Sequence, residues 1–346
     1  GYTSVGWNSG ATLGIVLGGI ITTLIGWRYI FFINVPVGLI SLYFGIKYIG
    51  KGKILDKKLD ISGMVTLSAS LVFISYAATD FASHGLDMLN AAMIMAGIIF
   101  AIIFVYIEKI SKSQILPLNM FSNRIFSFSI FASFFQSLGF LSVTFIVIMY
   151  LQGIRGLSPL ESSLLLVPGY VLGGFTGPVF GKLSDRIGAR IPATLGMFLM
   201  AIAILFYMTL NLTSSIYLII PISIVSGLGS SMFFPANNSA VMSSSSAKTY
   251  GAASGILRTM ASIGQLGSFV IAISIASASI PRSVAFEVFA GVGKLAGGVS
   301  AEFLVGIRHA FIVSLAIILV GMFLSYVRGK ENRKKRIASP EKSDSL

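Results

Sequence analysis

Cysteine is absent from this sequence, and histidine occurs only twice in 346 residues. Without cysteine there is no disulfide, no thiolate ligand for a metal and no thiol nucleophile. Two histidines make a multi-histidine metal site improbable as well. The sequence therefore predicts no metal centre, no cofactor and no enzymatic role.

Charged residues are also scarce. Asp, Glu, Lys and Arg make up 11% of the chain, whereas 55% of its residues are hydrophobic. An ordinary soluble domain has about 25% charged residues, so this chain has too few to cover a globular surface. Apolar runs of about 20 residues, the length that crosses a bilayer, fill most of the sequence. The expected fold class is an all-α polytopic membrane protein rather than a β-barrel.

Charge-free runs predict about ten transmembrane helices, because the polar turn at 211–215 divides one long run in two. The runs are 1–27, 29–46, 61–79, 88–107, 125–154, 162–180, 191–247, 259–281 and 310–327.

Most of the 25 Lys and Arg residues lie in alternate loops between these runs. Basic residues collect on the cytoplasmic side of short loops. This pattern predicts a multi-pass protein of the cell membrane with both chain ends in the cytoplasm. The net charge of +13 then reflects orientation in the lipid bilayer, and no nucleic-acid partner is expected.

One charged segment carries a specific motif, G-x-L-x-D-R-x-G-x-R, between two apolar runs. Its residues are Gly181, Asp185, Arg186, Gly188 and Arg190. The motif resembles the loop signature of the major facilitator superfamily, where it lies between the second and third helices of each six-helix half. The resemblance implies a conformational-switch loop here.

Further segments are similar to the fourteen-helix drug/proton antiporter branch of that superfamily. Residues 26–38, with Trp27, Arg28, Asn34 and Pro36, resemble its junction between helices five and six. Residues 227–237 followed by 251–255 and 264–267 resemble its tenth and eleventh core helices.

The resemblance implies a domain order in which the family's first four helices do not appear. Under this interpretation the sequence is N-terminally incomplete, and the 346 residues alone are expected not to transport. The implied segments are two last helices of the N-terminal half (1–48), a basic cytoplasmic linker (49–60), two additional linker helices (61–108), a second cytoplasmic linker (109–124), a C-terminal six-helix half-bundle (125–328) and a disordered basic cytoplasmic tail (329–346).

Glycines in the first run resemble the antiporter motif of the fifth helix, with Ile15 where that motif has proline. Gly10, Gly14 and Gly18 repeat every four residues, with Gly19 beside them, which suits close helix packing in a bilayer. A generic small-residue packing face explains the same pattern.

A transporter of this kind implies a central cavity at mid-membrane, lined by polar stripes at helical spacing. A wall of phenylalanine and serine with one amide suits an apolar or aromatic substrate. The same side chains also serve helix packing and lipid contact. The cavity candidates are Ser129, Ser133, Phe134, Gln136, Phe140, Ser226, Ser230, Asn237 and Gln265.

Arg258 is the clearest ionisable residue within a predicted span, with Ser262 and Gln265 on the same face. Such residues are costly in lipid and usually functional. We expect Arg258 to act as an interface latch with an Asp of the other half, or alternatively to extend toward the cytoplasm.

The predicted function is secondary active, proton-coupled efflux of small hydrophobic or amphipathic compounds, that is, multidrug efflux by a protein acting as a monomer when complete. Alternatives are uptake or exchange of a specific metabolite, and a non-transport helical subunit of a membrane complex. The carboxylates lie at the ends of predicted spans, so proton coupling follows from the resemblance and not from these residues.

Overall fold

The computed structural model describes residues 2–48, 60–85, 87–111, 117–246, 249–276 and 299–329. Within these ranges the chain is helical and has no strand, so the predicted all-α class is confirmed. Most of the predicted linker at 49–60 and of the predicted tail at 329–346 lies outside them, as do residues 277–298. The long helices are α1 (Tyr2–Leu24), α2 (Tyr29–Tyr48), α3 (Ile61–His84), α4 (Met88–Ile110), α5 (Arg124–Met149), α6 (Pro159–Ile187), α7 (Arg190–Met208), α8 (Ile219–Ser243), α9 (Tyr250–Ala276) and α11 (Val299–Val327).

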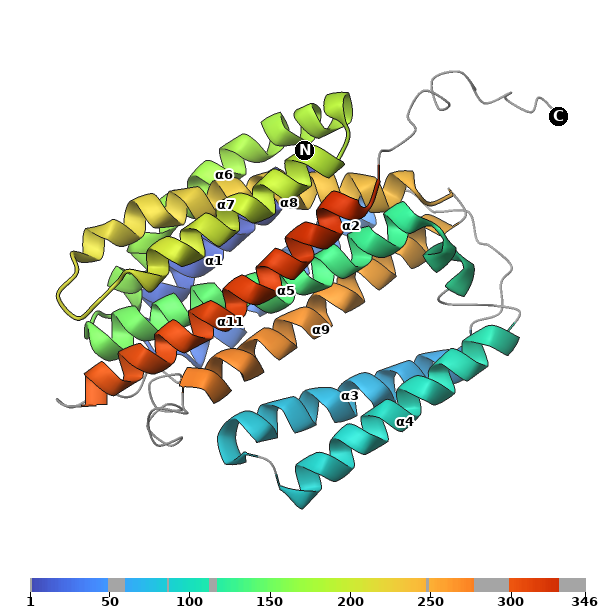
Figure 1. The fold of residues 1–346 in the computed structure, drawn as a ribbon, viewed down its shortest axis with the longest axis horizontal. Helices are drawn as coiled ribbons and strands as arrows, with labels where there is room; N and C mark the ends of the chain where they lie inside the picture. Colours follow the sequence, from blue (N-terminus) through green and yellow to red (C-terminus); the bar gives the residue numbers. More distant parts are fainter. Residues whose placement is uncertain are drawn as a thin grey trace.

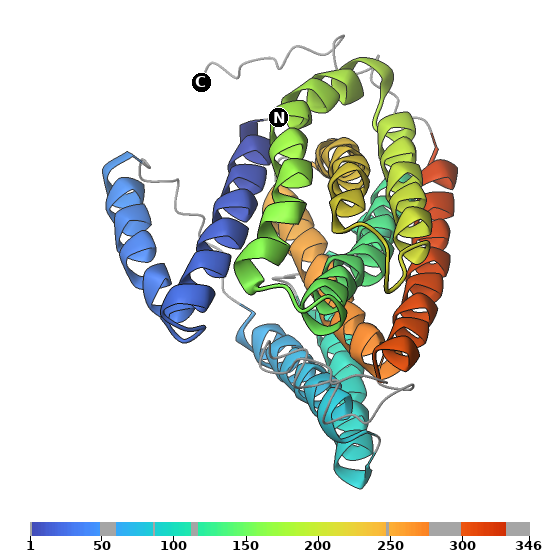
Figure 2. The same ribbon diagram turned by 90° about the vertical axis from the view of Figure 1, so that its left-hand side faces the viewer.

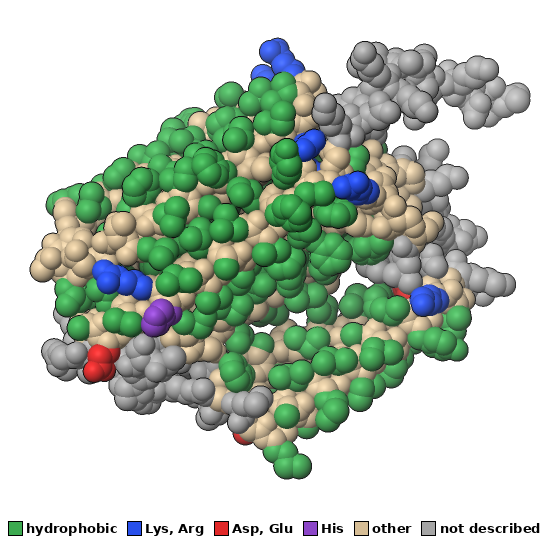
Figure 3. Space-filling model, viewed as in Figure 1, with side chains coloured by type: hydrophobic (Ala, Val, Ile, Leu, Met, Phe, Trp, Pro, Cys, Tyr) green, Lys and Arg blue, Asp and Glu red, His purple; other side chains and the backbone are tan. Residues whose placement is uncertain are grey.

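Among the residues that the structure describes, nine helices are long and apolar enough to cross a membrane. Hydrophobic side chains cover the face seen in Figure 3, while charged side chains and histidine lie toward the ends of the helices. Large apolar residues such as Phe175 (78% exposed) and Phe31 (66% exposed) point outward. This distribution suits a surface bathed by lipid rather than water.

Six helices, α5 to α9 and α11, form one bundle (Figure 1). Within it α8 packs between α6 and α7, and α5 packs between α9 and α11. Helix α11 also contacts α7, which joins the two groups. The main hydrophobic core runs through this bundle and includes Val147, Met197, Phe233 and Phe311.

Glycine permits a close contact between α6 and α8. A Cβ on Gly227 of α8 would lie 2.0 Å from the backbone oxygen of Gly169 on α6. Real side chains do not approach that closely, so the spacing of α6 and α8 requires glycine at both positions. This contact borders the cavity described below.

Helices α3 and α4 form a hairpin beside the bundle, which α3 contacts through α9 (Figures 1 and 2). At mid-length the Ser70 hydroxyl donates to the Gly97 carbonyl oxygen at 2.8 Å. At one end the Asn90 side-chain amide donates to Asp80 at 2.7 Å.

Asp60 stabilises the other end of the hairpin. Its carboxylate accepts the Gly63 amide at 2.8 Å and the Ser62 hydroxyl at 2.9 Å, which caps α3. The hydrogen bond from Gly63, followed by that from Ser111 at the end of α4, holds the pKa of Asp60 below its usual range. The carboxylate therefore stays ionised and ties the two helix ends together.

Helices α1 and α2 lie on the opposite side of the bundle from α11 (Figure 2). Helix α1 packs against α6. Within the described residues a Cβ on Gly10, Gly14 or Gly18 would meet nothing within 4 Å, so the packing role of these glycines stays a prediction. Gly19 is the exception, since its Cβ would lie 2.9 Å from the Ser163 hydroxyl oxygen.

The turn between α1 and α2 contains the predicted helix five to six junction. Gly26 has a φ of 104°, which favours glycine, and the Arg28 guanidinium lies 5.0 Å from the Trp27 ring centre. The Asn34 side chain donates to the Ile30 carbonyl, and Pro36 lies inside α2. Helix α2 has no buried residue among those described.

Candidate functional site

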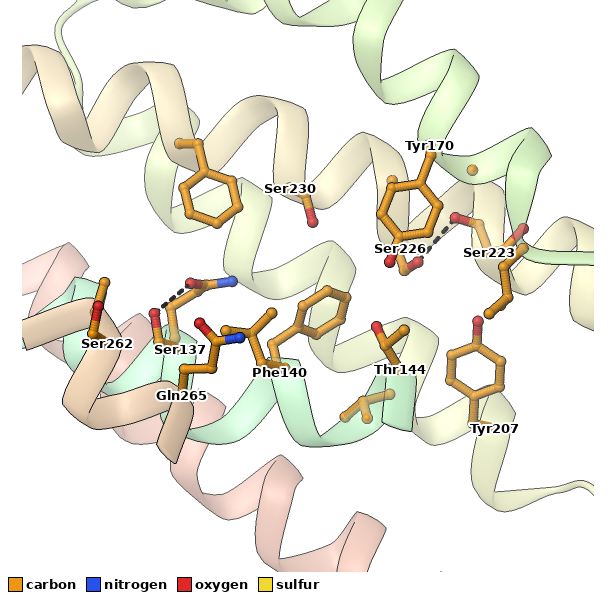
Figure 4. Close-up of a pocket in the computed structure, with 18 of the residues that line it drawn as sticks. Ser137, Phe140, Thr144, Tyr170, Tyr207, Ser223, Ser226, Ser230, Ser262 and Gln265 are labelled. Carbon is orange, nitrogen blue, oxygen red and sulfur yellow. Dashed lines mark hydrogen bonds between the residues drawn. The ribbon is translucent and has the colours of Figure 1, made fainter. Parts of the chain in front are cut away.

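A cavity of about 300 Å³ opens between five helices of the bundle (Figure 4). Its volume is at the lower end of the range typical of small-molecule pockets. Hydroxyl, amide and aromatic side chains share the wall. The lining residues are Gln136, Ser137, Phe140, Leu141, Val143, Thr144, Leu166, Gly169, Tyr170, Tyr207, Ser223, Ser226, Gly227, Ser230, Phe234, Arg258, Ala261, Ser262 and Gln265.

Helix α5 supplies one long wall of the cavity. Gln136, Phe140 and Thr144 follow at intervals of four residues and so share one face of the helix. Thr144 follows Gln136 by eight positions, which is about 12 Å along the helix axis. Gln136 is only 1% exposed, and its amide oxygen accepts the Ser137 hydroxyl at 3.5 Å.

Helix α8 forms the opposite wall with Ser223, Ser226 and Ser230 (Figure 4). The Ser226 hydroxyl donates to the Ser223 carbonyl oxygen at 2.9 Å, which satisfies its donor within the helix and leaves the oxygen as an acceptor. Tyr170 of α6 and Tyr207 of α7 reach the cavity near Ser223 and Ser226. Tyr170 faces Thr144, and Tyr207 faces Ser226.

Helix α9 closes the other end with Arg258, Ser262 and Gln265. These residues are four and three apart and therefore lie on one helical face, as the sequence predicts. Arg258 lies two turns after the start of α9 and its side chain is exposed at the edge of the cavity.

Five of the nine predicted cavity residues line this cavity: Gln136, Phe140, Ser226, Ser230 and Gln265. The other four, Ser129, Ser133, Phe134 and Asn237, are not among its lining residues. Ser129 lies about two helical turns before Gln136, and Asn237 lies about one turn after Phe234, at the end where α5 begins and α8 ends. A helical stripe gives the face on which residues lie but not how far along that face a cavity extends.

Ser129 and Asn237 instead surround a buried arginine that the sequence places in a basic flank. Arg328 directly follows α11 and is 1% exposed. Its guanidinium donates to the Asn237 side-chain oxygen at 3.0 Å, to the Ser129 hydroxyl at 3.2 Å and to the Ala189 carbonyl. The Asn237 amide donates back to the Ser129 carbonyl at 3.1 Å. Arg328 thus joins α5, α8, α11 and the turn between α6 and α7.

The predicted switch loop is largely helical, which corrects the expected loop. Gly181, Asp185 and Arg186 belong to the last turns of α6. Gly188 ends that helix with a φ of 90°, and Arg190 begins α7 with its guanidinium 4.3 Å from the Tyr326 ring centre. Polar residues near a helix end interrupt an apolar run without ending the helix, so the predicted span at 162–180 is too short.

Helix α11 also begins earlier than the predicted span at 310–327. Arg308 and His309 therefore lie inside it rather than in a loop. The Arg308 guanidinium donates to the Leu210 carbonyl at 3.2 Å, at the end of the bundle away from Arg328.

The lining residues that were not predicted include Ser137, Thr144, Tyr170 and Tyr207. Thr144 continues the α5 stripe by two turns beyond Gln136, so its spacing gives a usable signal. Tyr170 and Tyr207 come from helices without a polar stripe, and their positions follow from tertiary packing. No group of three or more His, Asp or Glu residues that could hold a metal is present in the ranges that the structure describes.

A bundle of membrane-length apolar helices around a polar and aromatic cavity defines a polytopic membrane protein with a candidate small-molecule site. Residues 1–269 match the family description "Major Facilitator Superfamily". The match covers well over half of the chain, and the chain belongs to this superfamily.

Curated relatives carry names from drug resistance and transport. The chain is 29% identical over 267 residues to "Multidrug transporter protein MdtP" of Bacillus subtilis (strain 168), covering 75% of this chain and 48% of the relative. It is 27% identical over 360 residues to the "Tetracenomycin C resistance and export protein" of Streptomyces glaucescens, and the match covers 93% of this chain and 66% of the relative. It is 26% identical over 326 residues to "Riboflavin transporter RibZ" of Clostridioides difficile (strain 630), and the match covers 92% of this chain and 68% of the relative.

The chain therefore spans between about half and two thirds of the length of these relatives. Among solved structures, a bacterial homologue of the human lysosomal transporter Spinster, in an inward-facing and occupied conformation, matches with a TM-score of 0.45 and 15% identity. That match covers 77% of this chain and 66% of the other.

Proposed function

We propose that this protein is a secondary active transporter of the cell membrane that exports small hydrophobic or amphipathic compounds in exchange for protons. The cavity carries the proposal. Its wall combines phenylalanine and leucine with hydroxyl and amide groups, which suits substrates that are apolar but hydrogen-bonding. The name of the tetracenomycin C resistance and export relative supports export, and that of the multidrug transporter supports a range of substrates.

The proposal assigns residues 125–328 to a C-terminal half-bundle, 61–108 to two additional linker helices and 1–48 to helices of the other half. The described packing supports this division, because α5 to α9 and α11 form one bundle while α3 and α4 pair with each other. In this arrangement substrate binds between the halves, and the two halves rock to expose it to each side in turn. The transporter acts as a monomer.

Proton exchange needs a group that binds and releases a proton during the cycle. None of the lining residues in the described part of the cavity is a carboxylate. The proposal therefore places the proton carrier outside this wall. Arg258, at the edge of the cavity, is the proposed latch between the halves.

Transport is tested by expressing the protein from its own gene in a bacterial strain that lacks its major efflux pumps. Cells are loaded with the neutral dye Nile red, and its fluorescence is followed after energisation with glucose. We expect faster dye loss than in vector controls, and we expect an uncoupler to abolish the difference. Dye loss equal to that of the controls would contradict export.

A matched pair of variants ties the activity to the cavity. Gln136→Leu keeps the side-chain size but removes the amide from the wall, so the range of exported compounds should change. Ser133→Ala alters a residue of the same helix that is outside the lining set and should leave the range unchanged. Net uptake is the competing direction, which faster dye accumulation than in the vector controls would reveal.

A further inference from the structure

Gln136 of α5 lies where four helices of the bundle meet. Its side-chain nitrogen contacts the Met200 sulfur of α7, and a Cβ on Gly321 of α11 would lie 3.6 Å from its backbone nitrogen. Two residues earlier, a Cβ on Gly264 of α9 would lie 2.6 Å from the Phe134 carbonyl oxygen. Helices α7, α9 and α11 thus enclose this part of α5, and Gln136 borders open space on the side of the cavity.

The carboxamide of Gln136 is buried but weakly bonded. The residue is 1% exposed. Its nitrogen donates to the Met200 sulfur at 3.8 Å, and a thioether sulfur is a weak acceptor. Its oxygen accepts the Ser137 hydroxyl at 3.5 Å, which is longer than the usual range of about 2.5–3.0 Å for a hydroxyl donor. A buried amide with such partners gains free energy when a molecule in the cavity offers better ones.

The bonding capacity of the amide indicates which chemical groups would satisfy it. A carboxamide has two N–H donors and an oxygen with two lone pairs. The contacts with Met200 and Ser137 use one of each. One N–H and one lone pair on the same planar group are left for a ligand. The complementary edge has a carbonyl oxygen beside an N–H, as in a lactam or an imide, and glutamine pairs by two bonds with such a donor and acceptor edge in adenine.

Aromatic side chains define where the ring that carries this edge would lie. Phe140 follows Gln136 by one helical turn on the same face of α5, and Phe234 lines the cavity from α8. Aromatic rings prefer offset-stacked or edge-to-face contact with another ring. A flat ring system that packs against Phe140 would therefore present one of its edges to Gln136.

We infer that Gln136 is a specificity-determining residue that selects planar aromatic compounds with a lactam or imide edge. The carbonyl oxygen of that edge accepts from the Gln136 amide, and its N–H donates to the Gln136 oxygen. The inference rests on the proposed function, because it names a substrate class for the same cavity.

Phenanthridinone and N-methylphenanthridinone test the inference as a matched pair. Both are flat, neutral and carry the carbonyl group, but methylation removes the N–H and blocks the edge. Their binding to the protein, expressed from its own gene, is measured by equilibrium dialysis in nanodiscs of zwitterionic lipid, with empty nanodiscs subtracted. We expect phenanthridinone to bind at least about fivefold more tightly. Partition into lipid favours the methylated compound and so cannot produce this order.

Variants assign the preference to one side chain. Gln136→Met keeps the length of the side chain and removes the amide, so the two compounds should bind within about twofold of each other. Gln152→Met is the matched control, since it makes the same substitution in the turn that follows α5, outside the cavity lining. The control should retain the preference for phenanthridinone. Circular dichroism and size-exclusion chromatography verify that each variant is folded, and the comparison of the two ligands on the unaltered protein depends on no variant.

The outcomes separate this inference from the proposed function. Equal binding of the two compounds by the unaltered protein, or a preference that survives Gln136→Met, would overturn the inference and leave the cavity a binding site. Binding of neither compound by a protein that exports Nile red would also overturn the inference and leave the proposed function standing. Failure of the proposed function is seen separately, as dye loss equal to that of the vector controls.

Discussion

Arg328 shows how a single residue can join several helices. Its guanidinium is buried and bonded to groups from α5, α8 and the turn between α6 and α7, although it belongs to the end of α11. A buried charge is tolerated where neighbouring acceptors replace its hydration. Removing either the acceptors or the guanidinium therefore deprives the other group of a buried hydrogen bond.

That dependence predicts a non-additive mutational cycle. Asn237→Leu removes an acceptor from a buried charge and should lower the free energy of unfolding by about 1–3 kcal/mol. Arg328→Met leaves Asn237 and Ser129 without that donor and should also destabilise. The double variant should be clearly less destabilised than the sum of the two, because an apolar pair replaces a half-satisfied polar one.

Unfolding in mixed detergent micelles, followed by circular dichroism, measures these differences. Arg124→Met is the matched control, since Arg124 is exposed and donates to the Val327 carbonyl at the same end of α11. Its effect should stay within about 0.5 kcal/mol. Strict additivity of the Arg328 and Asn237 substitutions would show that the two side chains do not interact.

At the scale of elements, the packing of α6 on α8 depends on glycine. Gly227→Ala would place a Cβ 2.0 Å from the Gly169 backbone oxygen, so the helices would have to separate beside the cavity. We expect a loss of stability of about 1–3 kcal/mol or more and a lower apparent melting temperature. The comparison is Gly255→Ala in α9, where a Cβ meets nothing within 4 Å and alanine should stabilise by about 0.5–1 kcal/mol. Equal melting temperatures for the two variants would refute the contact.

The positions of the helices were predicted far better than the residues at which they end or the helices that they contact. Apolar runs located every long helix, because length and hydropathy depend only on local sequence. The ends of α6 and the start of α11 were misplaced, because Asp185, Arg186 and Arg308 are polar but remain helical.

The candidate site was predicted only in part, because spacing along one helix does not show which helices pack together. Gln136 and Phe140 were found from helical spacing on α5, and Gln265 from its position beside Arg258 on α9. Tyr207 required knowledge of which helices pack together. The burial of Arg328 was not predicted, because a sequence does not show that a basic residue turns back into the bundle.

The whole molecule should be oriented with the Ser246 end of α8 in the cytoplasm, as its basic loops predict. The sequence contains no cysteine, so single cysteines report on sidedness without a background. Ser215→Cys, before α8, should react with a membrane-impermeant maleimide in intact spheroplasts. Ser246→Cys, after α8, should react only after permeabilisation. The reverse pattern would invert the topology.

The α3–α4 hairpin has a consequence for the evolution of such a protein. Its two helices pair with each other and touch the bundle chiefly through α3 and α9, so few contacts define its position. Two crossings return the chain to the side from which it left. Gaining or losing the pair as a unit would therefore preserve the orientation of every later helix, whereas gaining or losing a single helix would turn α5 to α11 upside down.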